Sequence, residues 1–426
     1  MILKVRPSKL SGTVEAPSSK SLSQRFIAAS LLANAPSRLF NYSECDDCTS
    51  AIKLAVDLGG EIELAQSGIG VNPVEGGIPR PRTNELNAGE SGLSFRLFSA
   101  IAALSSEEIT LGAEGTLQNR PQSFVMDGLN ALGAKATTTD GKAPVHITDH
   151  LKGGEIEIDG SISSQFLTGL LLALPYAEND SVIKVKNLVS RPYMEMTLEV
   201  MDAYNLDCKH TESEGLDVFE IPGNQSAEGG DYVVDGDWSA AATLLTLGAL
   251  AGAPEVEVTG IRGPFTQADS GIKGALLFAG YHLLGTEGGL QIKRKKPKAF
   301  NLDLTNSPDL FPVLAVLAGF SKKKSTLKGV NRLRGKESDR AAVLQKELSK
   351  AGITIEIDGD TMSIIPGKIK PCTIDSHGDH RIVMAAAIIG CAGETVYIEG
   401  AECVSKSYPG FFDDLEALGA NISTIN

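Results

Sequence analysis

The sequence contains few aromatic residues, few cysteines and no long apolar run. Aromatic residues make up 5% of its 426 residues, and the single tryptophan is Trp238. No apolar stretch approaches the length that crosses a bilayer, and Met1–Pro7 lacks the apolar core of a signal peptide. The six cysteines are scattered through a chain long enough to build a large core. This usage favours reduced thiols in a cytoplasmic protein over a disulfide framework.

Positive charge is also scarce. The 39 Lys and Arg residues are outnumbered by 53 Asp and Glu residues, which gives a net charge of −14. Nucleic-acid binding usually needs a basic face, so we expect neither nucleic acid nor a membrane as a partner. Hydrophobic residues at 42% and charged residues at 22% are ordinary for a globular protein. The length exceeds what one hydrophobic core usually supports, which predicts at least two domains.

Three short motifs resemble parts of known sites but are incomplete. The Cys45–Cys48 segment has the CxxC spacing of half a zinc or redox site, but no second CxxC and no nearby histidine completes it. His377 and His380 in HGDH are interpreted as loop residues. The PSSKS segment at 17–21 only partly matches a GxxxxGK[ST] phosphate loop. We therefore expect no metal and no organic cofactor.

A repeat of about 70 residues organises the chain. In each copy a strand, a small polar turn and an apolar helix follow one another, and a second strand, loop and helix come next. The turns contain Ser18, Ser91, Ser163, Trp238, Pro308 and Gly378. The unit reads βαβαββ, and six units of about 70 residues account for nearly the whole chain, which predicts an α/β (α+β) fold.

Cationic and polar residues recur at equivalent positions of these copies. Helix N-termini attract anions, so helices that point inward would form an electropositive cavity despite the net charge. The starts of the first helices contain Lys20, Ser21, Arg25, Arg96, Ser163, Ser164, Gln165, Asp309, Asp379, His380 and Arg381. The loops before the second helices contain Arg120, Arg191, Lys336, Glu337, Arg340 and Lys406. Solvent exposure could explain any one cation, but their recurrence favours the binding of two multiply charged anions.

Two acids among these cations are candidates for proton transfer. Glu337 lies between Lys336 and Arg340, and adjacent cations favour its ionised form. Asp309 precedes an apolar helix and is a candidate base. An internal ion pair for Glu337 and a helix-capping role for Asp309 are the structural alternatives, and the pattern does not decide between them.

An ordered set of motifs resembles one enzyme family. SSKSLSQR, NRP, SISSQFLTGLL, SRPY, SPD, GKESDR, DHR and SKSYPGF follow one another with matching intervals from about Leu10 to Leu418. Together they resemble the 3-phosphoshikimate 1-carboxyvinyltransferase (EPSP synthase) family. The resemblance implies two similar lobes of three βαβαββ units (an inside-out barrel) joined by a two-stranded hinge. Because three copies of the repeat precede Asp235 and three follow it, we expect residues 1–17 and 235–426 in one lobe and 18–234 in the other, with a hinge near 15–18 and 233–237. It implies transfer of the enolpyruvyl group of phosphoenolpyruvate to the 5-hydroxyl of shikimate 3-phosphate, in aromatic amino acid biosynthesis, by a cofactor-free monomer that glyphosate inhibits.

The resemblance also implies roles for the matching residues. The shikimate 3-phosphate site would contain Lys20, Ser21, Arg25, Ser163, Ser164, Gln165, Ser190, Asp309 and Lys336, with Tyr193 nearby. The phosphoenolpyruvate site would contain Lys20, Gly92, Arg120, Gln165, Arg340, Arg381 and Lys406. Asp309 would be the base for the attacking hydroxyl, and Glu337 with Lys20 would protonate the methylene carbon.

The chain departs from the family pattern at several positions. Glu90 and Leu93 replace the usual residues of the turn before Arg96, which places an acid near a site for an anion. Arg332 stands where some members have an asparagine that contacts substrate, so that contact is not carried over. Trp238 occupies a turn usually built from small residues.

Two other functions remain as alternatives. A sister enzyme transfers enolpyruvate to a UDP-amino sugar, but it has Lys-Asn where this chain has Lys20–Ser21, and it has a cysteine in a loop that contains none here. A phosphate-ligand sensor without catalytic activity is disfavoured by the presence of Lys20, Asp309, Glu337 and Lys406.

Overall fold

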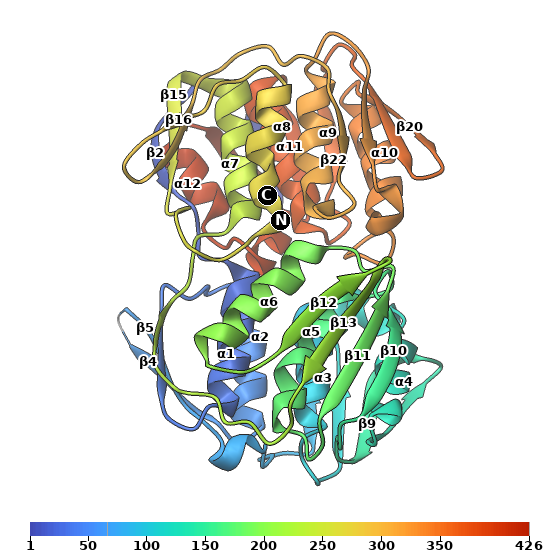
Figure 1. Ribbon diagram of the computed structural model, residues 1–426. Helices are drawn as coiled ribbons and strands as arrows, with labels where there is room; N and C mark the ends of the chain where they lie inside the picture. The colour runs from blue at the N-terminus through green and yellow to red at the C-terminus, as the bar shows by residue number, and fades with distance from the viewer. Residues whose placement is uncertain (66, 426) are drawn as a thin grey trace. The chain divides into compact units, whose positions relative to one another are not determined.

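The computed structural model describes residues 1–65 and 67–425. The chain divides into two compact units (Figure 1). Unit 1 consists of Met1–Pro17 and Asp235–Asn426, and unit 2 consists of Ser18–Val234. The strands of the described residues form six four-stranded sheets, three in each unit. No helix among these residues has both the length and the apolar character needed to span a membrane.

The elements of unit 2 follow one another in a regular order. Its helices are α1 (Lys20–Leu32), α2 (Asp46–Asp57), α3 (Gly92–Ala102), α4 (Ser123–Ala131), α5 (Ser164–Ala173) and α6 (Arg191–Ala203). Its strands are β3 (Ser37–Phe40), β4 (Glu61–Ala65), β5 (Gly68–Asn72), β6 (Glu85–Asn87), β7 (Ile109–Gly112), β8 (Lys135–Thr139), β9 (Lys142–Asp149), β10 (Glu155–Asp159), β11 (Ser181–Lys186), β12 (Lys209–Ser213), β13 (Leu216–Ile221) and β14 (Asp231–Val233). Short 3₁₀ turns are η1 (Glu75–Gly77), η2 (Gly115–Asn119) and η3 (Leu174–Tyr176).

Unit 1 repeats this order. Its helices are α7 (Trp238–Ala251), α8 (Ile272–Phe278), α9 (Phe311–Gly319), α10 (Arg340–Lys350), α11 (His380–Ala392) and α12 (Phe411–Ala417). Its strands are β1 (Ile2–Arg6), β2 (Leu10–Glu15), β15 (Gly252–Thr259), β16 (Leu284–Gly285), β17 (Gly289–Ile292), β18 (Asn301–Asp303), β19 (Ser325–Lys328), β20 (Thr354–Asp358), β21 (Thr361–Ile365), β22 (Cys372–Asp375), β23 (Val396–Glu399) and β24 (Asn421–Ile425). Its 3₁₀ turns are η4 (Ala268–Gly271), η5 (Pro308–Leu310), η6 (Val330–Leu333) and η7 (Ala401–Lys406).

Every sheet has the same pairing pattern. In the sheet β10-β11-β13-β12, β10 is parallel to β11, and β13 is antiparallel to both β11 and β12. The parallel strands β10 and β11 need a crossover connection, which contains α5. The antiparallel strands β12 and β13 form a hairpin. This arrangement is the βαβαββ unit that the sequence repeat predicts. The mixed α/β fold with six such sheets is therefore confirmed.

Two strands are exchanged between copies of the repeat. β2 pairs in parallel with β15, so that Val14 lies opposite Val258, although in the sequence β2 precedes α1. β14 pairs in parallel with β3, so that Tyr232 lies opposite Leu39, although β14 precedes α7. In the repeat each of these strands directly precedes a first helix, but each pairs within the unit that the chain then leaves. The pairing differs because the chain passes from one unit to the other directly after each of these strands.

The first helix of each copy lies in the core of its unit. In unit 1, α7, α9 and α11 pack against one another. Every residue of α9 is buried, and α7 is buried from Ala240 to its end. Small residues on these helices, such as Ala385–Ala387 of α11, allow the close packing that central helices require. In unit 2, α3 packs against α1 and α5 in the same way. The sheets surround these helices, which is the inside-out arrangement.

Candidate active site

The N-termini of α1, α3 and α5 lie close together in unit 2. Ser19 and Ser91 cap α1 and α3, because their side chains accept hydrogen bonds from backbone N–H groups of the first turns. The Gln24 amide donates to Ser91 Oγ over 3.4 Å, which links the starts of α1 and α3. Arg96 Nη1 donates to Gln165 Oε1 over 2.6 Å, which links α3 and α5. The converging helix starts produce a region of positive potential.

Gly92 lies directly beside two cations of this region. A Cβ at Gly92 would be 3.3 Å from Arg120 Nη1, 3.6 Å from Gln165 Oε1 and 3.8 Å from Arg96 Nη1. Three residues that the sequence assigned to the phosphoenolpyruvate site, namely Gly92, Arg120 and Gln165, are thus neighbours. Arg120 Nε is buried without a hydrogen-bond partner among the residues described. Such a donor is available to an anionic ligand.

Lys20 lies in the first turn of α1 and pairs with Asp47, which the sequence analysis did not predict. Its Nζ lies 2.9 Å from Asp47 Oδ2, and both side chains are largely buried. Asp47 belongs to the CxxC segment, whose cysteines are both buried at the start of α2. A hydrogen bond from Cys48 lowers the pKa of Cys45, and burial raises the pKa of Cys48. This segment contributes the Asp47 partner of Lys20.

Arg25 is almost completely buried in a neutral environment. Its guanidinium donates to Thr197 Oγ1, Thr168 Oγ1 and the backbone oxygens of Ser21 and Tyr193 over 2.8–3.2 Å. Because burial disfavours its charge, the pKa of Arg25 falls to about 10. None of these contacts neutralises the cation, so an anion bound nearby would stabilise it.

The serines assigned to the shikimate 3-phosphate site occupy two helix starts. Ser163 precedes α5 and Ser164 begins it, and Ser163 Oγ is buried with no hydrogen-bond partner in the described part of the chain. Ser190 precedes α6 and has the left-handed backbone angles φ 57° and ψ 38°. A serine rarely adopts this conformation, and strain of this kind is typical of ligand-binding sites. Tyr193 lies in the first turn of α6.

The two unusual residues of the loop before Arg96 have separate environments. Leu93 is buried on α3, so it is a core residue. The carboxylate of Glu90 packs against the backbone of Gly115, where an added Cβ would lie 2.4 Å from the carboxylate carbon. Gly115 also has a φ of +51°, so glycine is needed there both for space and for conformation.

Arg191 differs from the other candidate cations because acids already surround it. It makes paired contacts with Asp217 at 2.7 and 2.8 Å and with Glu212 at 3.1 and 3.2 Å. The hydrogen bond to Asp217 raises the pKa of Arg191. Asp217 is fully buried on β13 and is also contacted by His210 at 2.8 Å. Arg191 thus ties the start of α6 to the β12–β13 hairpin.

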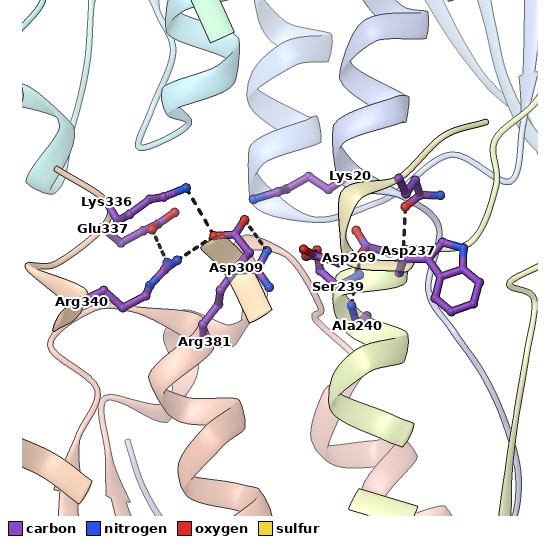
Figure 2. Close-up of polar contacts among 12 residues, drawn as sticks. Lys20, Asp237, Ser239, Ala240, Asp269, Asp309, Lys336, Glu337, Arg340 and Arg381 are labelled. Atoms are coloured by element: carbon purple, nitrogen blue, oxygen red, sulfur yellow. Dashed lines mark hydrogen bonds and ion pairs between the residues drawn. The ribbon is translucent and has the colours of Figure 1, made fainter. Parts of the chain in front are cut away.

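Asp309 is the centre of the polar cluster in unit 1. Its carboxylate lies 2.7 Å from Arg340, 3.1 Å from Arg381 and 3.4 Å from Lys336 (Figure 2). These cations come from the starts of α10 and α11 and from the loop before α10. Asp309 itself lies in the η5 turn before α9. Four residues from three separate parts of the sequence are therefore brought together, and η5 places the carboxylate among the cations.

Arg340 connects this carboxylate to two further acids. Its Nη2 lies 2.6 Å from Glu337, and its Nε lies 2.9 Å from Asp379. Burial opposes the charge of Arg340, but the carboxylates of Asp379, Glu337 and Asp309 raise its pKa above the ordinary value. Asp379 also caps α11 by accepting from the Arg381 N–H. From the sequence, Asp379 was predicted only to lie at the start of a helix.

Two lysines complete the cluster. Burial lowers the pKa of Lys336, although the nearby Asp309 carboxylate acts in the opposite direction. Arg332 is among the cations whose repulsion adds to this decrease. Lys406 Nζ donates to the backbone oxygen of Gly378 over 3.2 Å, at the turn that precedes α11. A lysine with a lowered pKa gives up or shares a proton more readily than an ordinary lysine.

Asp269 is a buried acid that was not predicted from the sequence. It lies in η4, and its Oδ2 accepts a hydrogen bond from Ser239 of α7 (Figure 2). Its other oxygen has no hydrogen-bond partner among the described residues. Burial and the repulsion of Asp309 raise the pKa of Asp269 to about 6. No local motif marks this residue, because the acid is separated in sequence from every residue with which it interacts.

Trp238 and the two HGDH histidines have defined positions. Trp238 begins α7 and is not in the preceding turn, and Asp237 caps that helix. The Lys273 ammonium lies over the Trp238 ring, 4.8 Å from the ring centre. His377 contacts the buried Glu347 of α10 at 3.0 Å, and His380 is buried at the start of α11. Within residues 1–65 and 67–425, no group of three or more His, Cys, Asp or Glu side chains is arranged to hold a metal ion.

Each unit thus has its own chemistry. Unit 2 offers helix N-termini, serine hydroxyls and the cations Lys20, Arg25, Arg96 and Arg120, which suit phosphate and carboxylate groups. Unit 1 offers two acids, Asp309 and Glu337, that share Arg340, and a lysine with a lowered pKa. Proton acceptors and donors of this kind suit acid–base chemistry on a polar substrate.

Comparisons with known proteins show which family the chain resembles. Residues 5–415 match the family described as EPSP synthase (3-phosphoshikimate 1-carboxyvinyltransferase). The 3-phosphoshikimate 1-carboxyvinyltransferase of Photobacterium profundum is 34% identical over 96% of this chain and 97% of its own length. The protein of the same name from Aeropyrum pernix is 35% identical over 99% of this chain and 96% of its own length.

Solved structures show the same fold. EPSP synthase from Acinetobacter baumannii superimposes with a TM-score of 0.81 at 25% identity, over 99% of this chain and all of the other. The enolpyruvyl transferase NikO from Streptomyces tendae, at 16% identity and a TM-score of 0.75, shows the likeness of the fold alone. The family match over nearly the whole chain carries the assignment: this chain belongs to the EPSP synthase family.

Proposed function

We propose that this chain transfers the enolpyruvyl group of phosphoenolpyruvate to the 5-hydroxyl of shikimate 3-phosphate, with release of phosphate. The family match and the full-length relatives of that name support this reaction. The observation that carries the proposal is the Asp309 cluster, in which one carboxylate contacts three cations and one of those cations is shared with Glu337. The reaction makes chorismate precursors for aromatic amino acids.

The proposed chemistry needs a base, an acid and a cationic environment. Asp309 accepts the proton of the 5-hydroxyl as its oxygen attacks carbon 2 of phosphoenolpyruvate. Glu337, together with Lys20, delivers a proton to carbon 3, which becomes a methyl group in the tetrahedral intermediate. Loss of phosphate from carbon 2 and of a proton from carbon 3 restores the double bond. The ionised form of Asp309 that this step requires is favoured by Lys336, Arg340 and Arg381.

The anionic groups are assigned to the cations and helix starts. We assign the shikimate 3-phosphate contacts to Lys20, Ser21, Arg25, Ser163, Ser164, Gln165, Ser190, Asp309 and Lys336. We assign the phosphoenolpyruvate contacts to Lys20, Gly92, Arg120, Gln165, Arg340, Arg381 and Lys406. The buried unpaired atoms Ser163 Oγ and Arg120 Nε support this assignment, because a bound anion would satisfy both. The assigned residues come from both units, and we propose that a hinge near 15–18 and 233–237 joins the units.

A phosphate-release assay tests the function directly. Phosphate should appear only when shikimate 3-phosphate and phosphoenolpyruvate are both present. Release with a UDP-amino sugar in place of shikimate 3-phosphate would assign the chain to the sister reaction, and binding of both substrates without turnover would indicate a sensor. We further propose a cytoplasmic monomer, which sedimentation of the purified protein and fractionation of its source cells would test.

A further inference from the structure

The densest run of positive charge in the sequence lies outside the proposed site. Five of the six residues from 293 to 298 are basic and exposed, and we call these five residues the basic segment: Lys293, Arg294, Lys295, Lys296 and Lys298. The chain has a net charge of −14, so the remainder carries −19 when these five charges are removed. Among the residues described, Lys293 is the one member that pairs with a carboxylate, that of Glu255 at 3.1 Å.

Large apolar side chains are exposed beside this segment. Leu277 and Phe278 end α8 and are 56% and 69% exposed, and Leu284 of β16 is 61% exposed. A single exposed leucine needs no explanation, but three bulky apolar side chains within eight residues of the sequence do. Because water solvates them poorly, their exposure favours contact with another apolar surface.

Hydrogen bonds hold the basic segment against the turn after α8. Lys295 Nζ donates to the Gly280 oxygen, and the Lys298 N–H donates to the Ala279 oxygen, both over 2.8 Å. Tyr281 Oη donates to the Lys295 oxygen over 2.5 Å. This turn directly follows Phe278, so the basic segment lies beside the exposed end of α8, and we treat the two together as one surface.

This surface contains a hollow of about 350 Å³. Its lining includes the apolar or aromatic residues Tyr281, Leu283 and Leu284 and the basic residues Lys293, Arg294 and Lys295. A hollow with this lining accommodates a bulky side chain while the surrounding cations contact acids next to it. An aromatic side chain in such a pocket, with charged contacts around it, is a frequent arrangement at protein interfaces.

We propose that this surface docks an acidic segment of a partner protein that carries an aromatic or bulky aliphatic side chain. An anionic bilayer fits less well, because the hollow is concave and a bilayer surface has no side chain to fill it. Nucleic acid fits less well because it leaves the exposed aliphatic side chains without apolar partners. Opposite charge fixes the orientation of the partner, and the apolar side chain adds affinity.

Docking there leaves the proposed chemistry undisturbed. The surface includes the last residues of α8, whose first residue, Ile272, follows Asp269 by three positions. A seven-residue helix is roughly 10 Å long, so about that distance separates the exposed end of α8 from the end near Asp269. Variants of the surface should therefore keep the activity of the unmodified protein.

The probes are two synthetic polyanions, poly(Glu) and a random copolymer of Glu and Tyr, with binding measured by fluorescence anisotropy. In one variant Arg294, Lys296 and Lys298 are replaced by glutamate, which keeps the Lys293–Glu255 pair and the Lys295–Gly280 bond. The matched control replaces Lys322–Lys324, three exposed lysines of the same unit between α9 and β19, by glutamate. A third variant combines Phe278→Ser with Leu284→Ser. Phosphate release is measured for all of them.

The wild type should bind the copolymer at least about tenfold more tightly than poly(Glu). In the first variant the affinity for the copolymer should fall at least about tenfold, whereas in the control it should change less than about twofold. The third variant should lose the preference for the copolymer. Equal loss in the control would show that only net charge matters. Tighter binding to phosphatidylserine vesicles or to poly(U) than to the copolymer would assign the surface to a bilayer or to RNA. Each of these results would overturn the proposal.

Discussion

Arg340 and Asp379 form a buried pair that fixes the starts of two helices. Arg340 Nε and Nη2 lie 2.9 and 3.2 Å from the two oxygens of Asp379, and both side chains are almost completely excluded from solvent. Arg340 begins α10, and Asp379 caps α11. Because Arg340 also contacts Asp309 and Glu337, this one pair determines where both proposed catalytic acids lie. Pairs of this kind contribute more to geometry than to net stability.

Replacement of Glu337 by glutamine tests its role as the acid. The amide keeps the shape of the side chain near Arg340 but cannot deliver a proton. We expect turnover to fall by about 10²–10⁴-fold, with little change in the affinity for shikimate 3-phosphate. The measurement is phosphate release under saturating substrates, together with the melting temperature.

Glu347→Gln is the matched control for this variant. Glu347 also belongs to an i,i+3 ion pair, with Lys350 of α10. Burial opposes its charge, but hydrogen bonds from Lys350 and His377 lower its pKa, so the change should reduce stability and not turnover. If Glu337→Gln lowers the melting temperature while the folded protein keeps wild-type turnover, Glu337 is only the partner of Arg340.

The sequence predicted the repeat far better than it predicted the contacts of individual residues. The periodic turns located each first helix to within a few residues, because capping residues and apolar runs are local signals. The repeat did not name the strands with which β2 and β14 pair, because strand pairing depends on contacts between segments that are distant in sequence. The cluster around Asp309 was recognised through ordered motifs, whereas Asp47 and Asp269 were missed. Their partners are distant in sequence, and the residues next to them give no signal of burial.

Asp269 should make the stability of the protein fall as the pH rises. Its pKa is about 6 in the folded protein, against 3.8 for an ordinary aspartate. The folded state therefore binds more protons than the unfolded state between these values, so the stabilising contribution is complete below about pH 4 and is lost as the pH passes 6. Asp269→Asn removes this titration, and we expect the variant to be more stable at pH 7.5 by about 3 kcal/mol.

The measurement is urea unfolding of both proteins at pH 4 and pH 7.5. The gain should be small at pH 4, where Asp269 of the wild type is largely protonated. A gain of the same size at both pH values would mean that the amide packs better than the acid and that ionisation is not the cause. A loss at pH 7.5 would show that the charged carboxylate is needed by the Arg381 end of the cluster.

Arg191→Ala should affect stability and not substrate affinity. Arg191 contacts the fully buried Asp217 and the exposed Glu212, so its removal leaves a buried carboxylate with His210 as its remaining partner. We expect a loss of about 1–3 kcal/mol in unfolding free energy. The Michaelis constants for both substrates should stay within about twofold, whereas Arg120→Ala should raise the constant for phosphoenolpyruvate by about tenfold or more. A comparable increase for Arg191→Ala would place that residue at the phosphoenolpyruvate site.

Gly92→Ala tests the loop that the sequence aligned with the phosphoenolpyruvate site. The added methyl carbon would lie 3.3 Å from Arg120 Nη1 and 3.6 Å from Gln165 Oε1, which is close enough to displace a ligand that uses the same space. The backbone at Gly92 is helical, so alanine adds no conformational strain. We expect glyphosate to compete with phosphoenolpyruvate in the wild type. In the variant, the inhibition constant should rise at least about tenfold, with a smaller change for the substrate.

Glu90→Gln is a second test of the same loop. Its carboxylate lies against Gly115 and adds negative charge to the loop that carries Gly92. Glu90→Gln should therefore lower the inhibition constant, because the repulsion of a second anion is removed. Inhibition curves at several phosphoenolpyruvate concentrations measure all three proteins. Equal inhibition constants in the wild type and Gly92→Ala would show that Gly92 does not line the pocket, and the assignment of Arg120 and Gln165 to the same site would then lose its support.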